Sequence, residues 1–174
     1  MNWTQAQVQE ACKKFGPAIH AYSLVDGYGY PLSGIKLLWA ISGQESSFGA
    51  NCGPRLEPAY WDGAYSETGL QQELNRQYGI AAAKSYGPWQ VMYQNCYRLG
   101  TPGEIDADIN LGAQAAVDFL NDYVIGSQKA VSLQQIARVY NSGNLTVPMT
   151  MGVMRYIENV GQYYKNAPTV LEAI

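Results

Sequence analysis

One glutamate stands out because it falls on the apolar face of an expected helix. Ser33 is a suitable N-cap, and residues 34–48 have the composition of a helix that starts there. Glu45 continues the buried stripe of this helix, which comprises Ile35, Leu38, Trp39 and Ser42 at three- and four-residue steps. Desolvation raises the pKa of a carboxyl group toward neutrality, as a general acid requires. Glu45 is therefore a candidate catalytic acid, and a partly exposed glutamate near a frayed helix end is the alternative.

Two later segments place polar side chains at the expected ends of helices. In residues 87–92, Gly-Pro-Trp-Gln-Val-Met, the proline suits a first helical position, so Gln90 is expected near a helix N-terminus. Residues 139–143, Val-Tyr-Asn-Ser-Gly, end another helix in a turn. Neither segment is specific for a function by itself.

Taken together and in this order, the segments resemble the lytic transglycosylase and goose-type lysozyme superfamily, whose members cleave bacterial peptidoglycan. That family's Glu-Ser-x-Phe motif is similar to residues 45–48, and its Gly-x-x-Gln-x-Met motif to residues 87–92. Its Ala-Tyr-Asn-Ala/Ser-Gly motif is similar to residues 139–143, with Val139 in place of alanine. Two weaker patterns, at residues 108–112 and 156–160, extend the resemblance from about Ile35 to Tyr164, although Asp108 replaces an asparagine.

The resemblance implies cleavage of the β-1,4 bond between N-acetylmuramic acid and N-acetylglucosamine. Glu45 would protonate the leaving oxygen and, in a transglycosylase, would then take the proton of the muramic acid 6-hydroxyl, giving a 1,6-anhydro product without water. Gln90, Tyr140 and Asn141 would bind the sugar or its acetamido group, and Met92 would line the cleft. Each of these four residues also has a purely structural interpretation. Gln90 could be a helix-end amide and Asn141 a turn residue, while Tyr140 and Met92 could be core residues.

The chain departs from the family between Glu45 and Gly87. The family has a short loop with a serine in this region, whereas residues 49–84 of this chain form a longer, family-specific insertion broken by glycines and prolines. The position that corresponds to the family's loop serine therefore cannot be identified in this chain. The insertion leaves a hydrolytic, goose-type lysozyme open as the alternative. An inverting hydrolase needs a second carboxylate that holds a water, and the candidates are Glu57, Asp62 and Glu67, which are equally suited to be solvated loop charges.

Composition narrows the class of ligand. The 174 residues are 47% hydrophobic and 14% charged, with a net charge of -3 and no basic run, which argues against nucleic acid and against an anionic membrane surface. Fourteen tyrosines and four tryptophans suit amphipathic ligands such as sugars. We expect a monomer that binds peptidoglycan glycan strands or chitooligosaccharides. A non-catalytic glycan-binding module and a helical domain with a purely structural role are more distant alternatives.

Neither a metal nor another cofactor is expected. His20 is the single histidine of the chain. The chain has three cysteines, Cys12, Cys52 and Cys96, and because this number is odd at least one thiol is free in a monomer. Cys52 and Cys96 could form a disulfide outside the cytoplasm.

No signal peptide or membrane-spanning run is visible. We therefore expect synthesis in the cytoplasm and action on the cell wall, as for a phage lysin or virion enzyme, or for a chain whose signal was removed.

Helical periodicity and capping patterns, among them capping boxes at residues 101–104 and 132–135 and an N-cap or first-turn position for Asp108, predict an all-α, mainly helical single domain over residues 1–174. The resemblance implies a lysozyme-like fold for this domain, with a helical extension at 1–32 and the insertion at 49–84. No stretch alternates convincingly at period two. Eight helices are expected, at residues 4–15, 18–24, 34–48, 70–84, 89–99, 106–123, 132–140 and 150–165.

Overall fold

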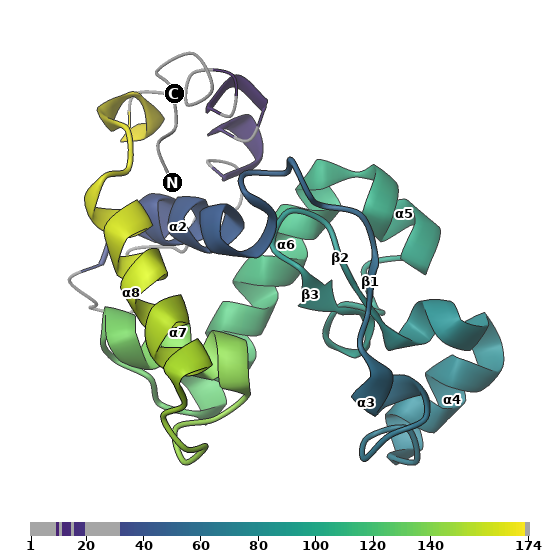
Figure 1. The fold of residues 1–174 in the computed structure, drawn as a ribbon. Coiled ribbons are helices and arrows are strands. Elements are labelled where there is room, and N and C mark those ends of the chain that lie inside the picture. The colour runs from purple at the N-terminus through teal and green to yellow at the C-terminus, as the bar shows by residue number, and fades with distance from the viewer. Residues whose placement is uncertain (1–9, 11, 15, 20–31, 173–174) are drawn as a thin grey trace.

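A computed structural model describes residues 10, 12–14, 16–19 and 32–172 of the chain (Figure 1). The described elements form a mainly helical single domain with a small three-stranded antiparallel sheet. His20 and most of the helices expected at 4–15 and 18–24 lie outside the described residues. No helix in the described part of the chain is both long enough and apolar enough to cross a membrane.

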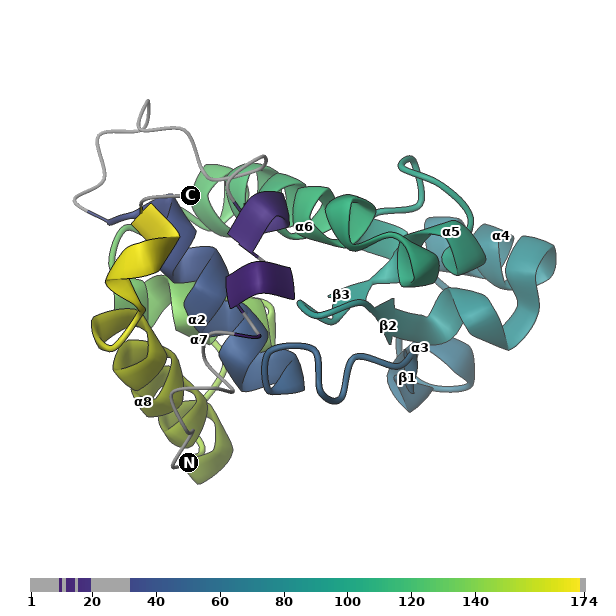
Figure 2. The ribbon, with the colours of Figure 1, turned by 90° about the horizontal axis from the view of Figure 1, so that it is seen from above.

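Helix α2, Gly34–Ser46, is the element against which the larger helices pack. It lies beside α8, Met151–Lys165, and also contacts α6, Ile109–Asp118 (Figure 2). The prediction of this helix and of its N-cap is confirmed, since the Ser33 side chain accepts a hydrogen bond from the Lys36 amide. Its core-facing side chains are fully buried, among them Leu37, Leu38, Trp39 and Ile41.

The end of α2 is an unusual backbone segment. The helix ends at Ser46, two residues before the predicted Phe48, because Ser47, Phe48 and Gly49 all have positive φ angles. The Ser46 hydroxyl donates to the Ser42 carbonyl and accepts from the Gly49 amide, so it bridges the two sides of the reversal. Non-glycine residues with positive φ are costly and cluster at functional sites. This strained turn directly follows Glu45.

After the end of α2 the chain folds back, so that the ring of Phe48 packs over Gly43 of that helix. A Cβ atom added at Gly43 would lie 2.6 Å from the ring. The same ring contacts Trp39 at a centroid distance of 4.1 Å and Tyr163 of α8 at 5.3 Å. The Phe48 contacts therefore fix the end of α2 against the core and, with it, the position of Glu45.

The helix predicted over residues 106–123 is divided into three. Helix α5, Pro102–Ala107, ends where Asp108 becomes the N-cap of α6, as expected of that residue. After α6 the winding changes to a π-helix, η4, Phe119–Ser127. An added Cβ at Gly126 would lie 2.7 Å from the Asn121 carbonyl oxygen, so a glycine permits this winding. The π-helix was not predicted, because no periodicity in the sequence distinguishes it from an α-helix.

The capping predictions for the later helices are confirmed. Thr101 with Glu104 and Ser132 with Gln135 form capping boxes at the starts of α5 and of α7, Leu133–Ser142. Thr150 caps α8. Helix α7 packs against α8 and the π-helix, which brings residues 139–143 toward the end of α2.

The small sheet contradicts the expectation of an all-α fold. Its strands are β1, Arg55–Leu56, β2, Lys84–Tyr86, and β3, Val91–Met92, in the order β1-β2-β3. Arg55 pairs with Ser85, and Ser85 with Met92. Strands of two or three residues are too short to show an alternating pattern, which is why the sequence did not reveal them.

Two predicted helices are corrected by this sheet. The helix expected at residues 89–99 is wrong: Gly87 and Gln90 have φ angles of 69° and 47°, which close a turn between β2 and β3, and a short 3₁₀ helix, Tyr93–Asn95, follows. The helix expected at 70–84 is confirmed only as α4, Gly69–Tyr78, because it passes into the 3₁₀ helix Gly79–Ala83 and then β2.

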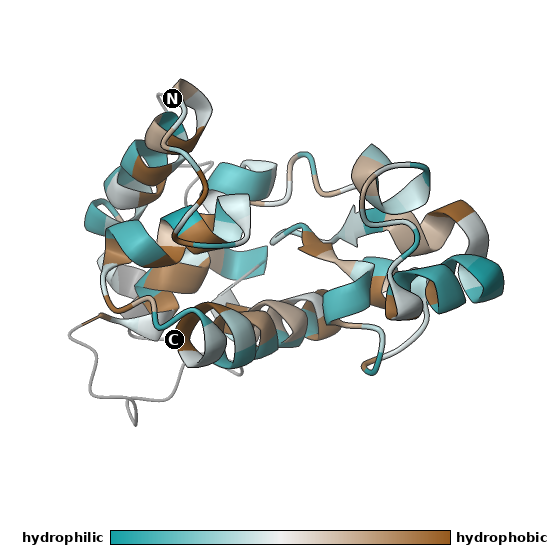
Figure 3. Ribbon diagram, turned by 90° about the horizontal axis from the view of Figure 1, so that it is seen from below, coloured by the Kyte–Doolittle hydropathy of each residue, from teal (hydrophilic) through white to brown (hydrophobic). Residues whose placement is uncertain are grey.

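The insertion at 49–84 supplies β1, α4, the 3₁₀ helix that follows α4 and the short helix α3, Pro58–Trp61. In Figure 3 the ribbon of α4 is coloured mostly as hydrophilic, whereas the ribbon of α6 contains more hydrophobic residues. The insertion thus forms a peripheral group of elements beside the helical core.

Candidate active site

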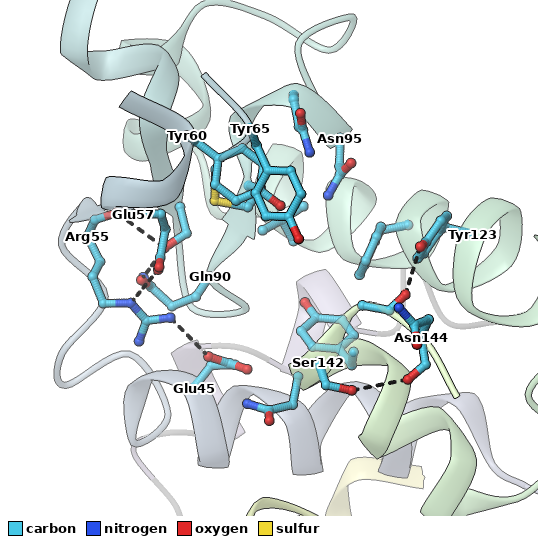
Figure 4. Close-up of a pocket in the computed structure, with 18 residues that line it drawn as sticks. Glu45, Arg55, Glu57, Tyr60, Tyr65, Gln90, Asn95, Tyr123, Ser142 and Asn144 are labelled. Atoms are coloured by element: carbon cyan, nitrogen blue, oxygen red, sulfur yellow. Dashed lines mark hydrogen bonds and ion pairs between the residues drawn. The ribbon is translucent and has the colours of Figure 1, made fainter. Parts of the chain in front are cut away.

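A cleft of about 640 Å³ lies between the helical core and the insertion (Figure 4). A volume of this size is typical of small-molecule sites. Its wall combines the end of α2, the sheet, the loop after α3, the π-helix and the end of α7. The lining residues are Glu45, Arg55, Glu57, Tyr60, Tyr65, Ser85, Gln90, Val91, Met92, Gln94, Asn95, Phe119, Tyr123, Tyr140, Asn141, Ser142, Gly143 and Asn144.

All five residues predicted for the site line this one cleft. Glu45 comes from α2, Gln90 and Met92 from the β2–β3 turn and β3, and Tyr140 and Asn141 from α7. The fold therefore brings together three segments that are far apart in the sequence. The contacts within the cleft differ from residue to residue.

The Glu45 side chain is held by groups from two other parts of the chain. Its Oε1 atom accepts a hydrogen bond of 2.6 Å from the hydroxyl of Tyr156 in α8. Its Oε2 atom lies 3.7 Å from Nη2 of Arg55 in β1, and the Glu45 side chain is 10% exposed. The carboxyl group is thus oriented and largely removed from solvent while it still borders the cleft.

The pKa of Glu45 is raised above its ordinary value of 4.5. Desolvation by burial is the largest cause, and the nearby charge of Glu57 adds to it. The Tyr156 hydrogen bond and the charge of Arg55 act in the opposite direction but do not cancel the effect of burial. A carboxyl group with a raised pKa can remain protonated closer to neutral pH, which suits a general acid.

Arg55 lies between two carboxylates at one end of the cleft. Its Nε atom donates a 2.9 Å hydrogen bond to Oε1 of Glu57, while its Nη2 atom faces Glu45. Its side chain is 56% exposed, so part of the guanidinium remains open to solvent or a ligand. Of the three candidate second carboxylates, Glu57 lines the cleft, whereas Asp62 and Glu67 are absent from its wall.

The amide of Gln90 braces the β2–β3 turn. Its Oε1 atom accepts a 2.9 Å hydrogen bond from the buried hydroxyl of Ser85, and its Nε2 atom donates to the Gly87 carbonyl at 2.8 Å. The same Nε2 atom lies 3.4 Å from the Gly53 carbonyl. The expected place of Gln90 near a helix N-terminus is therefore wrong, and its amide bonds mainly to the protein.

Trp89 connects the turn to helices α2 and α7. The buried indole Nε1 atom donates to the Leu38 carbonyl of α2 at 2.9 Å, and the Trp89 carbonyl accepts a 2.7 Å hydrogen bond from the hydroxyl of Tyr140 in α7. Burial, with a smaller contribution from the charge of Glu45, raises the pKa of Tyr140 well above its ordinary value. Tyr140 therefore stays neutral and ties α7 to the turn.

The far end of the cleft is formed by the C-terminus of α7. Gly143 caps the helix with a φ angle of 84°, and its carbonyl accepts a 2.7 Å hydrogen bond from the Tyr123 hydroxyl. Asn141 is exposed in the cleft wall, and Met92 is half-buried there. The exposed amide of Asn141 can donate to and accept from a polar ligand.

Several residues of the site were not predicted. Tyr156 was noted in a sequence pattern without a role, and neither Arg55 nor Ser85 was assigned one. Tyr156 lies on the buried face of α8, where a tyrosine is indistinguishable by sequence from a core residue, and Arg55 lies in a loop whose path only the folded chain defines. All three cysteines are free, so the suggested Cys52–Cys96 disulfide is absent.

Comparisons of the chain with family models, with curated proteins and with solved structures found no match. The arguments for a function therefore come from the cleft and from the sequence motifs.

Proposed function

We propose that the protein is a peptidoglycan-cleaving enzyme with a lysozyme-like fold, acting as a lytic transglycosylase on the β-1,4 bond between N-acetylmuramic acid and N-acetylglucosamine. The main support is Glu45, a carboxylic acid whose pKa is raised by burial and which lies at the side of a cleft. The resemblance of residues 45–48, 87–92 and 139–143 to the motifs of that superfamily is the second support, because all three segments border the same cleft.

In the proposed reaction, Glu45 donates its proton to the bridging oxygen as the bond from that oxygen to C1 of the muramic acid breaks. The acetamido group of the same sugar stabilises the positive charge at C1. The Glu45 carboxylate then takes the proton from the 6-hydroxyl, whose oxygen bonds to C1. The glycosidic bond is exchanged for an internal C1–O6 acetal bond, Glu45 regains its proton, and no water is consumed.

The other residues of the cleft would bind and orient the sugars. Asn141 supplies the exposed amide, and Met92 an apolar contact. Gln90 and Tyr140 would act mainly by fixing the cleft wall, because their polar groups bond to Ser85, Gly87 and Trp89. Tyr156 and Arg55 would set the orientation and the pKa of Glu45.

A hydrolytic lysozyme is the second candidate function, favoured by the position of Glu57. This carboxylate lines the same cleft and would hold the attacking water. Its Oε1 atom already accepts a 2.9 Å hydrogen bond from Arg55, which leaves fewer acceptor positions for a water than a free carboxylate has. We therefore place the transglycosylase first. The site of action would be the cell wall, reached after synthesis in the cytoplasm.

The test is digestion of purified cell walls by the parent protein and by Glu45→Gln, which keeps the shape of the side chain but has no acidic proton. We expect a loss of ~10²–10⁴ in rate. Glu73→Gln, on an exposed face of α4, is the matched control and should retain activity. Mass analysis of the products separates the two reactions, because an anhydro product is lighter by one water than the product of hydrolysis. Full activity of Glu45→Gln would refute the proposal.

A further inference from the structure

The cleft continues beyond Glu45 into a region walled by aromatic rings. Tyr60 and Tyr65 come from the insertion, and Phe119 and Tyr123 from the π-helix, and all four line the cleft. In Figure 4, Tyr60 and Tyr65 lie on the side of the cleft opposite Glu45, and Tyr123 lies at the end opposite Arg55. None of these four rings belongs to the three motif segments.

Each exposed ring in this region is supported by a second ring. Tyr65 is 51% exposed and packs against Tyr60 at a centroid distance of 5.0 Å. Tyr123 is 37% exposed and stacks on Phe119 at 5.4 Å with an interplanar angle of 11°. Rings that are already fixed in the free protein lose little conformational entropy when a ligand binds.

The Tyr123 ring is also held by its hydroxyl, which donates to the Gly143 carbonyl. This bond links the π-helix to the end of α7, next to Asn141. The amide of Asn141 and the ring of Tyr123 therefore border adjoining parts of one wall.

The π-helix that carries Phe119 and Tyr123 is a costly element. Its Asn121 Oδ1 atom is buried without a hydrogen-bond partner among the described residues. An unpaired buried polar atom lowers stability, and π-helical segments are rare and frequently occur at functional sites. This irregular winding is independent support for a role of the aromatic wall in binding.

We propose that Tyr65 and Tyr123 form a stacking subsite for a pyranose ring of a β-1,4-linked N-acetylated glycan. The face of a pyranose that carries its axial C–H bonds is apolar and packs against an aromatic ring, while its hydroxyl groups bond to polar side chains at the edge, here Asn141 and Asn144. This inference deepens the proposed function, on which its choice of glycan rests, by assigning a second sugar position in the cleft away from Glu45.

The test measures binding of chitohexaose by calorimetry in the Glu45→Gln background, in which the ligand is not consumed. We expect Tyr65→Ala and Tyr123→Ala each to weaken binding by about three- to tenfold. Tyr65→Phe keeps the ring and should bind within about twofold of the background protein. Trp61→Ala is the matched control, because Trp61 is an aromatic residue of comparable exposure, 39%, that does not line the cleft.

Circular dichroism of each variant establishes that it is folded. If Tyr123→Ala does not fold, Tyr65→Ala alone decides the question, since Tyr65 lies in an exposed loop. Unchanged affinity of folded Tyr65→Ala, or no binding of chitohexaose by the background protein, would overturn the subsite. If the aromatic variants lose affinity as expected but the parent protein releases no product from cell walls, the subsite stands and the proposed enzymatic function fails.

Discussion

The hydroxyl of Tyr156 donates a 2.6 Å hydrogen bond to Oε1 of Glu45, joining α8 to the end of α2 across 111 positions of the sequence. Tyr156 is itself buried, and its pKa is raised well above its ordinary value, first by burial and then by the charge of Glu45. Its hydroxyl therefore stays protonated, and able to donate, well above neutral pH. The bond favours the ionised form of Glu45, whereas burial favours the protonated form.

Replacing Tyr156 by phenylalanine is expected to move the pH dependence of catalysis. Without the hydrogen bond the pKa of Glu45 rises further, so the acid stays protonated to higher pH. The alkaline limb of the kcat/KM profile should therefore shift upward in Tyr156→Phe. Tyr97→Phe, outside the cleft, is the control. An alkaline limb that stays in place or moves to lower pH would contradict this assignment.

Arg55→Gln should produce a shift in the same direction for an electrostatic reason. The positive charge lowers the pKa of Glu45, so its removal raises that pKa and extends activity to higher pH. Because the Arg55 side chain is more than half exposed, added salt should screen its charge and move the parent profile toward that of the variant. Arg55→Lys retains the charge and should resemble the parent. Identical profiles for Arg55→Gln and the parent would count against the role of Arg55.

The raised pKa of Glu45 also predicts how stability depends on pH. When the folded pKa of an acid exceeds its unfolded value, the folded state loses stability as pH rises through the window that begins near 4.5, and the loss persists above the folded pKa. Glu45→Gln should therefore melt at a higher temperature than the parent at pH 7 and at nearly the same temperature at pH 3. Glu73→Gln controls for the loss of one surface charge. If Glu45→Gln melted at a higher temperature than the parent only at acidic pH, the pKa of Glu45 would be lowered by folding and not raised, and the assigned pKa shift would be refuted.

Gly43→Ala tests how the end of α2 is fixed. The new methyl group would lie 2.6 Å from the Phe48 ring, so we expect the ring to be displaced and the free energy of unfolding to fall by about 1–3 kcal/mol. Activity should fall as well, because Glu45 follows Gly43 by two residues. Gly161→Ala in α8 meets no atom within 4 Å and should stabilise the protein by roughly 0.5–1 kcal/mol. Denaturant unfolding compares the two, and equal stabilities would show that Phe48 does not constrain this position.

Local patterns predicted the parts of the fold that depend on local interactions. Ser33, Thr101 and Ser132 were identified as caps, and each side chain accepts a hydrogen bond from the amide three residues later. The sheet was missed because its ladder joins residues 55 and 85, and no local pattern records such a pairing. The turn at Gly87 was read as a helix start because Pro88 suits both structures.

For the site, the sequence determined the residue types and placed Glu45 on the inner face of a helix, because helical periodicity depends only on neighbours along the chain. Tertiary structure decided the environment of that carboxyl group: the hydroxyl of Tyr156, the guanidinium of Arg55 and the degree of desolvation. It also decided that the Gln90 amide braces a turn and that the rings of Tyr65 and Tyr123 border the same cleft. A pKa and a binding surface arise from groups brought together through space, so they become defined only when distant segments pack.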